Sequence, residues 1–147
     1  MVSQKILIKA PIEAVFNCIV DFESYPKFLP ETKSVKIDRH KGHEIEASFK
    51  INLIKEISYT LQVELDPPSG VYWKLKKGDL MKSNEGSWEL KAKGDAMTEA
   101  VYSIDVTFGL WVPNAITEAL VAKNLPQTLK RFKKRAESLT RKSSPPL

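Results

Sequence analysis

Cysteine is almost absent from this sequence, and long apolar runs are missing. The 147 residues include one cysteine, Cys18, which cannot form an internal disulfide, so a reducing compartment is expected. The longest uncharged apolar stretch, FGLWVPNAI at 108–116, falls far short of the roughly 20 residues that a membrane-spanning helix needs. The first residues, MVSQKILIKAPIEAVF, are unlike a signal peptide, because a proline and a glutamate interrupt the apolar segment. We therefore expect a soluble, cytoplasmic protein.

Catalytic and metal-binding motifs are also lacking. No G-x-S-x-G, Walker or dinucleotide-binding glycine pattern occurs. His40 and His43 have a spacing that suits zinc, but no other histidine or cysteine stands near them, so we expect exposed turn residues. Cys18 stands among apolar neighbours on a predicted helix, which is typical of a core residue and not of a reactive thiol. The sequence thus predicts no metal, no cofactor and no catalytic residue, and it favours a non-enzymatic protein.

The net charge of +5 is concentrated in one segment. Residues 123–142 contain eight lysines and arginines and a single acid, Glu137. At helical spacing these cations form one face beside an apolar one, and we predict a basic surface made of Lys130, Arg131, Lys134, Arg135 and Arg141. Such a surface can meet a ribosome or an anionic membrane. It can equally be a solvated helix face, since cations are favoured near helix C-termini.

Apolar periodicity predicts a strand, a short helix and then a meander of strands. Residues 3–9 form a short strand, and a helix follows from Pro11, where proline suits the first turn. This helix ends before Pro26, because the residue that precedes a proline avoids the helical region. Between 33 and 108, apolar and polar residues alternate in about six strands, with glycine or proline in the turns. This pattern is typical of an antiparallel sheet with one face to be covered.

The C-terminal segment provides that cover. From Pro113, apolar residues recur every three or four positions, which predicts a long helix. Pro126 interrupts the pattern, so the helix is expected either to kink near Asn124–Pro126 or to divide into two abutting helices. Residues 1–142 are expected to form one domain, and residues 143–147 a disordered tail.

Three segments resemble a known superfamily. They are APIEAVFNCIVDFESYPKFLP at 10–30, GDLMKSNEGSWEL at 78–90 and NLPQTLKRFKKRAESL at 124–139. In this order they resemble the START and Bet v 1-like superfamily, in its polyketide cyclase/dehydrase and lipid transport group. The likeness is closest to the branch of coenzyme Q-binding proteins and ribosome-association toxins. Where that branch has tryptophan or glycine plus cysteine after the FLP motif, this chain has Glu31-Thr32-Lys33.

The resemblance implies an α+β helix-grip fold. In this fold an antiparallel sheet of about seven strands wraps around a long C-terminal helix, with two short helices after the first strand. The short helices and the loop after them close one end of a cavity between the sheet and the helix. The stiff, apolar segment DFESYPKFLP at 21–30 would then line or cover that cavity.

A set of apolar and aromatic side chains is predicted to bind the ligand. The set combines the covering segment, the apolar strand faces and the start of the C-terminal helix: Tyr25, Phe28, Leu29, Tyr59, Trp73, Trp88, Tyr102, Trp111, Ile116 and Leu120. The alternative is that these residues are ordinary hydrophobic core.

Three functions remain open at this point. The first is a binding or carrier protein for a hydrophobic small molecule such as a quinone, a lipid or a polyketide. The second is a ribosome-associated protein that acts through its basic C-terminal helix. The third is a polyketide aromatase or cyclase, which would need an acid or base inside the cavity. The sequence does not predict the oligomeric state.

Overall fold

The computed structural model describes residues 2–109, 112–119 and 124–143, although the side chains of 141–143 lie outside this description. The elements follow in the order β1 (Val2–Ile8), α1 (Ile12–Val20), η1 (Phe22–Lys27), β2 (Thr32–Lys41), β3 (Glu44–Leu53), β4 (Lys55–Asp66), β5 (Gly70–Gly78), β6 (Met81–Ala92), β7 (Thr98–Phe108), α2 (Asn114–Glu118) and α3 (Leu125–Ser143). The tail predicted at 143–147 falls, apart from Ser143, outside the described residues.

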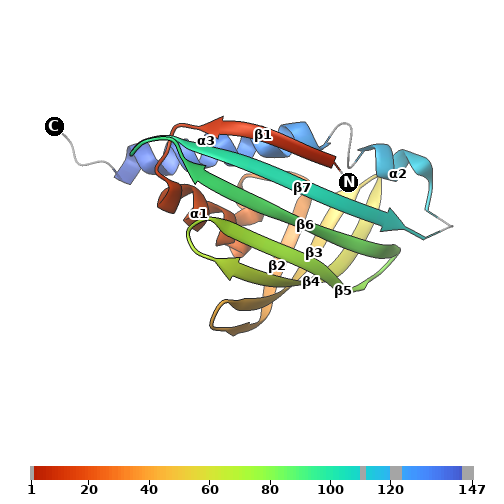
Figure 1. Cartoon of the computed structure of the whole chain (residues 1–147). Coiled ribbons are helices and arrows are strands. Elements are labelled where there is room, and N and C mark those ends of the chain that lie inside the picture. Colours follow the sequence, from red (N-terminus) through yellow and green to blue (C-terminus); the bar gives the residue numbers. More distant parts are fainter. Residues whose placement is uncertain (1, 110–111, 120–123, 144–147) are drawn as a thin grey trace.

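The strands form one antiparallel sheet in the order β1-β7-β6-β5-β4-β3-β2. Strands that are neighbours in the sequence are therefore neighbours in the sheet from β2 to β7, and β1 joins the far side of β7. Figure 1 shows the sheet curving past the long helix α3, which runs beside β1. The predicted α+β helix-grip fold with seven strands is confirmed.

The sheet has one buried face because side chains alternate along each strand. Strand β3 is the clearest case: Ile45, Ala47, Phe49 and Ile51 are all buried, and the residues between them are more exposed. The buried faces of the strands meet α1, η1 and α3 in the main hydrophobic core.

Two short helices, α1 and the 3₁₀ helix η1, connect β1 to β2. Helix α1 starts after Pro11, which has extended backbone angles, and ends at Asp21. The chain then forms the 3₁₀ helix η1, which contains Pro26. The two short helices predicted after the first strand are therefore confirmed. They present Phe22 and Tyr25, both buried, to the concave face of the sheet.

Helix α3 covers the sheet with an apolar stripe. Leu125, Leu129, Phe132 and Ala136 recur at helical spacing and are all buried. Helix α2 ends at Glu118 and α3 begins at Leu125, and residues 120–123 between them lie outside the described residues. The predicted interruption at Asn124–Pro126 coincides with the start of α3, which has Pro126 in its first turn, and whether the two helices abut stays a prediction. Within the described part of the chain, none of the helices is long and apolar enough to cross a bilayer.

Helix α3 also covers the outer edge of the sheet near the end of β1. The ammonium group of Lys133 donates a hydrogen bond of 2.9 Å to the carbonyl oxygen of Leu7. The backbone N–H of Lys9 donates to Oε2 of Glu137 at 2.8 Å. These two bonds satisfy backbone groups that an edge strand would otherwise leave open to another strand.

Candidate ligand cavity

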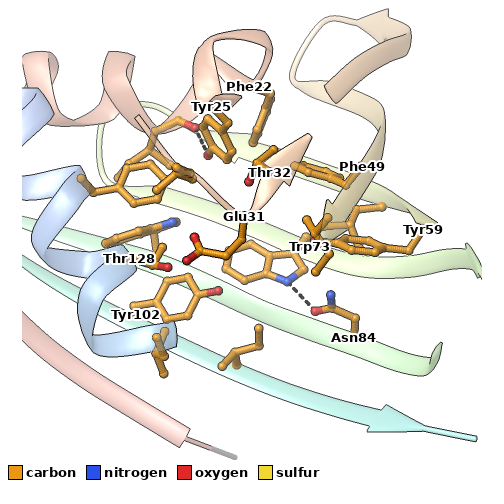
Figure 2. Close-up of a pocket in the computed structure, with 18 of the residues that line it drawn as sticks. Phe22, Tyr25, Glu31, Thr32, Phe49, Tyr59, Trp73, Asn84, Tyr102 and Thr128 are labelled. Atoms are coloured by element: carbon orange, nitrogen blue, oxygen red, sulfur yellow. Dashed lines mark hydrogen bonds between the residues drawn. The ribbon is translucent and has the colours of Figure 1, made fainter. Parts of the chain in front are cut away.

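A cavity lies between the concave face of the sheet, η1 and α3 (Figure 2). It has a volume of about 140 Å³ and is partly open, and its lining is mostly aromatic and aliphatic. This volume is close to the roughly 150 Å³ at which an engineered apolar cavity takes up one benzene molecule. It is below the roughly 300–1,000 Å³ of pockets that hold drug-sized ligands. As it stands, the cavity therefore has room for about one ring.

The cavity wall is a connected series of aromatic rings. Trp88 occupies its centre, with its ring centroid 4.8 Å from that of Tyr102 and 5.2 Å from that of Phe132. Tyr25 of η1 approaches Phe132 of α3 at 5.2 Å, edge to face. Trp73 lies 5.5 Å from Tyr102 on the other side. Edge-to-face and tilted pairs at these distances are favourable and hold each ring in a defined orientation.

Six of the ten residues predicted to bind a ligand line this one cavity. They are Tyr25, Leu29, Tyr59, Trp73, Trp88 and Tyr102. The strand residues are gathered because each lies on the apolar face of its strand, and Tyr25 and Leu29 are gathered because the 3₁₀ turn is docked over the end of the sheet. Whether they contact a ligand stays a prediction.

The other four residues are placed differently. Phe28 is not among the lining residues; its ring packs against Phe132 at 5.1 Å, and the Arg135 guanidinium lies 5.4 Å from its centroid. Ile116 is fully buried, but it belongs to a second apolar cluster with Ile57 and Met81. Trp111 and Leu120 lie outside the described residues.

Tyr25 holds the covering segment to the helix before it. Its hydroxyl donates a hydrogen bond of 2.5 Å to the carbonyl oxygen of Ile19, in the last turn of α1. A helix leaves its last carbonyls without intrahelical partners, so this bond satisfies a buried acceptor. Burial, helped by the nearby Cys18, raises the pKa of the Tyr25 phenol well above its ordinary value. The phenol therefore stays protonated and can keep donating.

A polar pair fixes the indole of Trp73. Its Nε1 donates a 3.0 Å hydrogen bond to Oδ1 of Asn84, which is buried on β6. The Asn84 amide nitrogen lies 3.6 Å from the sulfur of Met81 and donates to it. Gly86, directly opposite Trp73 in the register of β5 and β6, leaves the space in which the indole lies.

The hydroxyls of Tyr59 and Tyr102 differ from that of Tyr25. Within the described part of the chain, no residue forms a hydrogen bond with either hydroxyl. Burial raises the pKa of both phenols above the ordinary value, and for Tyr102 the neighbouring Tyr59 adds to the rise. Both groups are therefore neutral near pH 7 and can donate or accept a hydrogen bond.

Polar residues that the sequence did not predict also line the cavity. The most prominent is Glu31, whose carboxylate points into the cavity beside Thr128 and Tyr102 (Figure 2). With its amide oriented to satisfy both groups, Asn124 donates to the two carboxylate oxygens at 3.2 and 3.3 Å. Nη1 of Arg131 lies 3.7 Å from Oε2. The only sequence signal for this group was the departure at Glu31-Thr32-Lys33 from the family pattern.

The five predicted basic-surface residues do not form one exposed group. Lys130 and Lys134 are exposed. Arg131 is half-buried and faces Glu31, and Arg135 is half-buried with its guanidinium over the ring of Phe28. The side chain of Arg141 lies outside the described residues. Arg135 thus contacts the covering segment and Arg131 faces Glu31 directly after it, because α3 turns part of its charged face toward them.

The remaining candidates for chemistry are far from the cavity wall or inert. Cys18 is buried, and burial raises the pKa of its thiol to about 11, as expected for a core cysteine. His40 and His43 are exposed near the turn between β2 and β3, and Nε2 of His40 lies 3.1 Å from the carbonyl oxygen of Gly42. Among the described residues, no group of three or more potential ligands could hold a metal ion.

A curved antiparallel sheet that closes over a long C-terminal helix, with an apolar cavity between them, defines a protein of the helix-grip fold. The chain belongs to the polyketide cyclase / dehydrase and lipid transport family, whose model matches residues 8–133. The finer resemblance to the coenzyme Q-binding and toxin branch stays a prediction.

Solved structures share the fold at low sequence identity. The Zhui aromatase/cyclase from Streptomyces sp. R1128 is 18% identical, with a TM-score of 0.82 over 92% of each chain. A START superfamily protein from Mycobacterium smegmatis is 22% identical, with a TM-score of 0.82 over 95% of this chain and 98% of that one. A STAR-related lipid transfer protein from Xanthomonas axonopodis is 13% identical, with a TM-score of 0.70 over 91% and 84%. No curated protein matches the sequence.

Proposed function

We propose that the protein binds a small, mainly apolar molecule in this cavity and carries it without chemical change. The supporting observation is the wall of aromatic rings around a partly open cavity of about 140 Å³. A ring such as that of a quinone or an aromatic polyketide matches flat, oriented neighbours better than a flexible acyl chain does. Exclusion of water from the ring would supply the affinity, at about 25 cal/mol for each Å² of apolar surface buried.

A ligand larger than one ring needs the cavity to widen. The covering segment is the part we expect to move, because η1 and the following loop are held to the rest mainly by side-chain packing, as of Tyr25 on Phe132, and by one backbone hydrogen bond, from the N–H of Asn52 to the carbonyl of Glu31. The sheet, by contrast, is held by backbone pairing on every strand, with local register shifts in the β2–β3, β4–β5 and β6–β7 pairs. Extra rings would therefore extend toward η1 and Glu31 and not through the sheet.

The direct test is to identify what the protein holds in its own host. The chain is purified from that host and analysed by native mass spectrometry, and any bound molecule is extracted with organic solvent. A co-purifying quinone, lipid or polyketide supports the proposal. An empty protein that also fails to take up quinones or aromatic polyketides in vitro contradicts it.

A pair of variants links that result to the cavity. Ile104 lines the cavity from β7, and Ile104→Phe would fill it. Val106, two residues further along the same strand face, packs against the second apolar cluster, so Val106→Phe is the matched control. We expect the first variant to lose the bound molecule and the second to keep it.

An enzyme of the cyclase kind is the second candidate, and Glu31 supports it. Such a reaction needs an acid or base inside the cavity, and the Glu31 carboxylate and the Tyr102 hydroxyl both face that space. The test is to return the extracted molecule, or a linear polyketide analogue, to the purified protein and follow its mass. An unchanged mass supports the carrier, and loss of water with ring formation supports the enzyme.

A ribosome-associated protein is the third candidate. It is supported by the exposed lysines Lys130 and Lys134, which lie one turn apart on α3. Contact with RNA phosphates through these lysines would weaken steeply as salt is raised. Co-sedimentation with ribosomes at increasing salt tests it.

A further inference from the structure

We propose that the cavity selects an uncharged ligand whose ring carries a hydroxyl group, that is, a phenol or a hydroquinone, and that the carboxylate of Glu31 accepts the hydrogen bond from that hydroxyl. This inference rests on the proposed binding function and goes further, because it assigns a polarity to the ligand. It follows from which hydrogen-bonding groups of the cavity are already used within the protein and which are not.

Three of the cavity's N–H and O–H donors, those of Tyr25, Trp73 and Asn84, are already engaged within the protein. The hydroxyl of Tyr25 donates to the carbonyl of Ile19. The indole N–H of Trp73 donates to Asn84, whose own amide donates to Met81. A ligand that offers only acceptors is therefore left with neutral hydroxyls such as those of Tyr59 and Tyr102, because each engaged donor would first have to break a buried bond. A hydrogen bond from the ligand to the charged Glu31 is stronger than a bond between neutral groups.

The carboxylate of Glu31, by contrast, keeps capacity to accept. An ionised carboxylate offers about four acceptor positions. Asn124 occupies part of them, at 3.2 and 3.3 Å. Arg131 is too far for a hydrogen bond, since its Nη1 lies 3.7 Å from Oε2 and has no hydrogen-bond partner of its own among the described residues. A ligand hydroxyl that points at Glu31 would donate to one of the acceptor positions of the carboxylate that Asn124 leaves free.

The sign of the charge that faces the ligand is negative. Glu31 is among the lining residues and Arg131 is not, so the cation lies behind the carboxylate as seen from the cavity. Figure 2 shows the carboxylate directed into the space between Thr128 and Tyr102. A ligand carboxylate placed there would meet a like charge at a side chain that is 27% exposed, which is unfavourable. Aryl acids and fatty acids should therefore bind more weakly than the neutral phenol.

Three probes of nearly equal size separate these possibilities. p-Cresol offers a hydroxyl donor, p-xylene replaces that hydroxyl with a methyl group, and benzoate carries a negative charge. Each is titrated into the full chain at pH 7 and followed by two-dimensional ¹H–¹⁵N NMR. We expect p-cresol to bind about tenfold more tightly than p-xylene, as for a hydrogen bond to a charged group. Benzoate is expected to bind more weakly than either.

Substitution of the acceptor provides the second measurement. Glu31→Gln keeps the shape of the side chain and removes its charge, so the preference for p-cresol over p-xylene should fall to about twofold or less and the exclusion of benzoate should weaken. Glu64→Gln, at an exposed position on β4, is the matched control and should change neither ratio. Thermal unfolding of both variants shows whether each is folded.

The outcomes distinguish a failure of this inference from a failure of the proposed binding function on which it rests. If p-cresol and p-xylene bind with equal affinity, the cavity still binds an aromatic ring, but the proposed role of Glu31 is wrong. Tighter binding of benzoate than of p-cresol would overturn it too, and would point to Arg131 as the ligand's partner. If no probe shifts any resonance of a cavity residue, the cavity does not take a ring, and the proposed function falls with the inference. Because the first comparison uses the unmodified chain, it holds even if Glu31→Gln does not fold.

Discussion

Trp73 and Gly86 lie opposite each other on β5 and β6, and the indole of Trp73 occupies the space where a side chain at position 86 would stand. A β-carbon built on Gly86 would lie 2.5 Å from Cζ2 of the indole and would also meet the backbone carbonyl of Ser103. The glycine is thus the reason that one wall of the cavity can be a flat, fixed ring.

Gly86→Ala should therefore damage both stability and binding. The added methyl group must push the indole away from β6 or strain the β6–β7 ladder, and overpacking of this kind typically lowers the free energy of unfolding by about 1–3 kcal/mol. Urea unfolding measures the loss, and NMR of the Trp73 indole N–H reports whether its bond to Asn84 persists. Gly109→Ala is the control, because a β-carbon there meets only the carbonyl oxygen of Leu80, at an ordinary 3.7 Å. Equal losses in both variants would contradict this account of Gly86.

Tyr25→Phe should loosen the covering segment. The change removes the hydroxyl that donates to Ile19 and leaves that carbonyl without its side-chain partner at the end of α1. We expect the free energy of unfolding to fall by about 1–2 kcal/mol. Hydrogen exchange should also become faster in η1 than in the sheet. Tyr72→Phe, at a tyrosine that is 40% exposed, should change neither quantity.

High pH should destabilise the fold. The folded-state pKa of Cys18 is raised to about 11, and burial also raises those of Tyr25, Tyr59 and Tyr102. The unfolded chain therefore releases protons at a lower pH than the folded one, and stability is lost as pH rises. The loss should begin near pH 9 with Cys18, at up to about 1.4 kcal/mol per pH unit for each group, and steepen above about pH 10 as the unfolded tyrosines ionise.

Chemical denaturation at a series of pH values between 8 and about 11 measures that slope. Cys18→Ala is the informative variant, because it should flatten the curve between about pH 9 and 10 while the tyrosine part remains. A slope that is unchanged by this substitution would show that Cys18 does not titrate differently in the folded and unfolded states. The native thiol should also resist alkylation at pH 8 and become reactive on unfolding.

The basic helix offers a prediction for the ribosome candidate. If Lys130 and Lys134 contact phosphates, replacing both with alanine should make the slope of log affinity against log salt shallower by about two. Exposed lysines on β2 serve as the control, so Lys36→Ala with Lys41→Ala should leave the slope unchanged. Sedimentation with ribosomes measures both. Equal effects of the two pairs would indicate general charge attraction and not docking by α3.

The sequence predicted best where a regular period decides which way a side chain points. Trp73, Trp88 and Tyr102 were predicted to face inward because strands alternate, and all three line the cavity. Phe28 and Glu31 follow the short 3₁₀ helix, where no period links position to direction. Their orientation depends on how η1 docks against α3, which is a long-range packing result. The predicted cavity residue Phe28 therefore covers Phe132 from outside, while the unpredicted Glu31 points in.

The antiparallel pairing of β1 with β7 determines when the sheet can be completed during synthesis of the chain. Within the described part of the chain, Val2–Ile8 pairs only with residues of β7, from Thr98 to Ile104, so this strand is made long before its partner exists. At about 5–20 residues per second, the ribosome needs roughly 5–20 s to make the intervening chain. During that time the strand is unpaired, and the charge of Lys5 within it makes pairing with other chains less favourable. The sheet can be completed only late in translation, and such long-range pairing also makes folding slow.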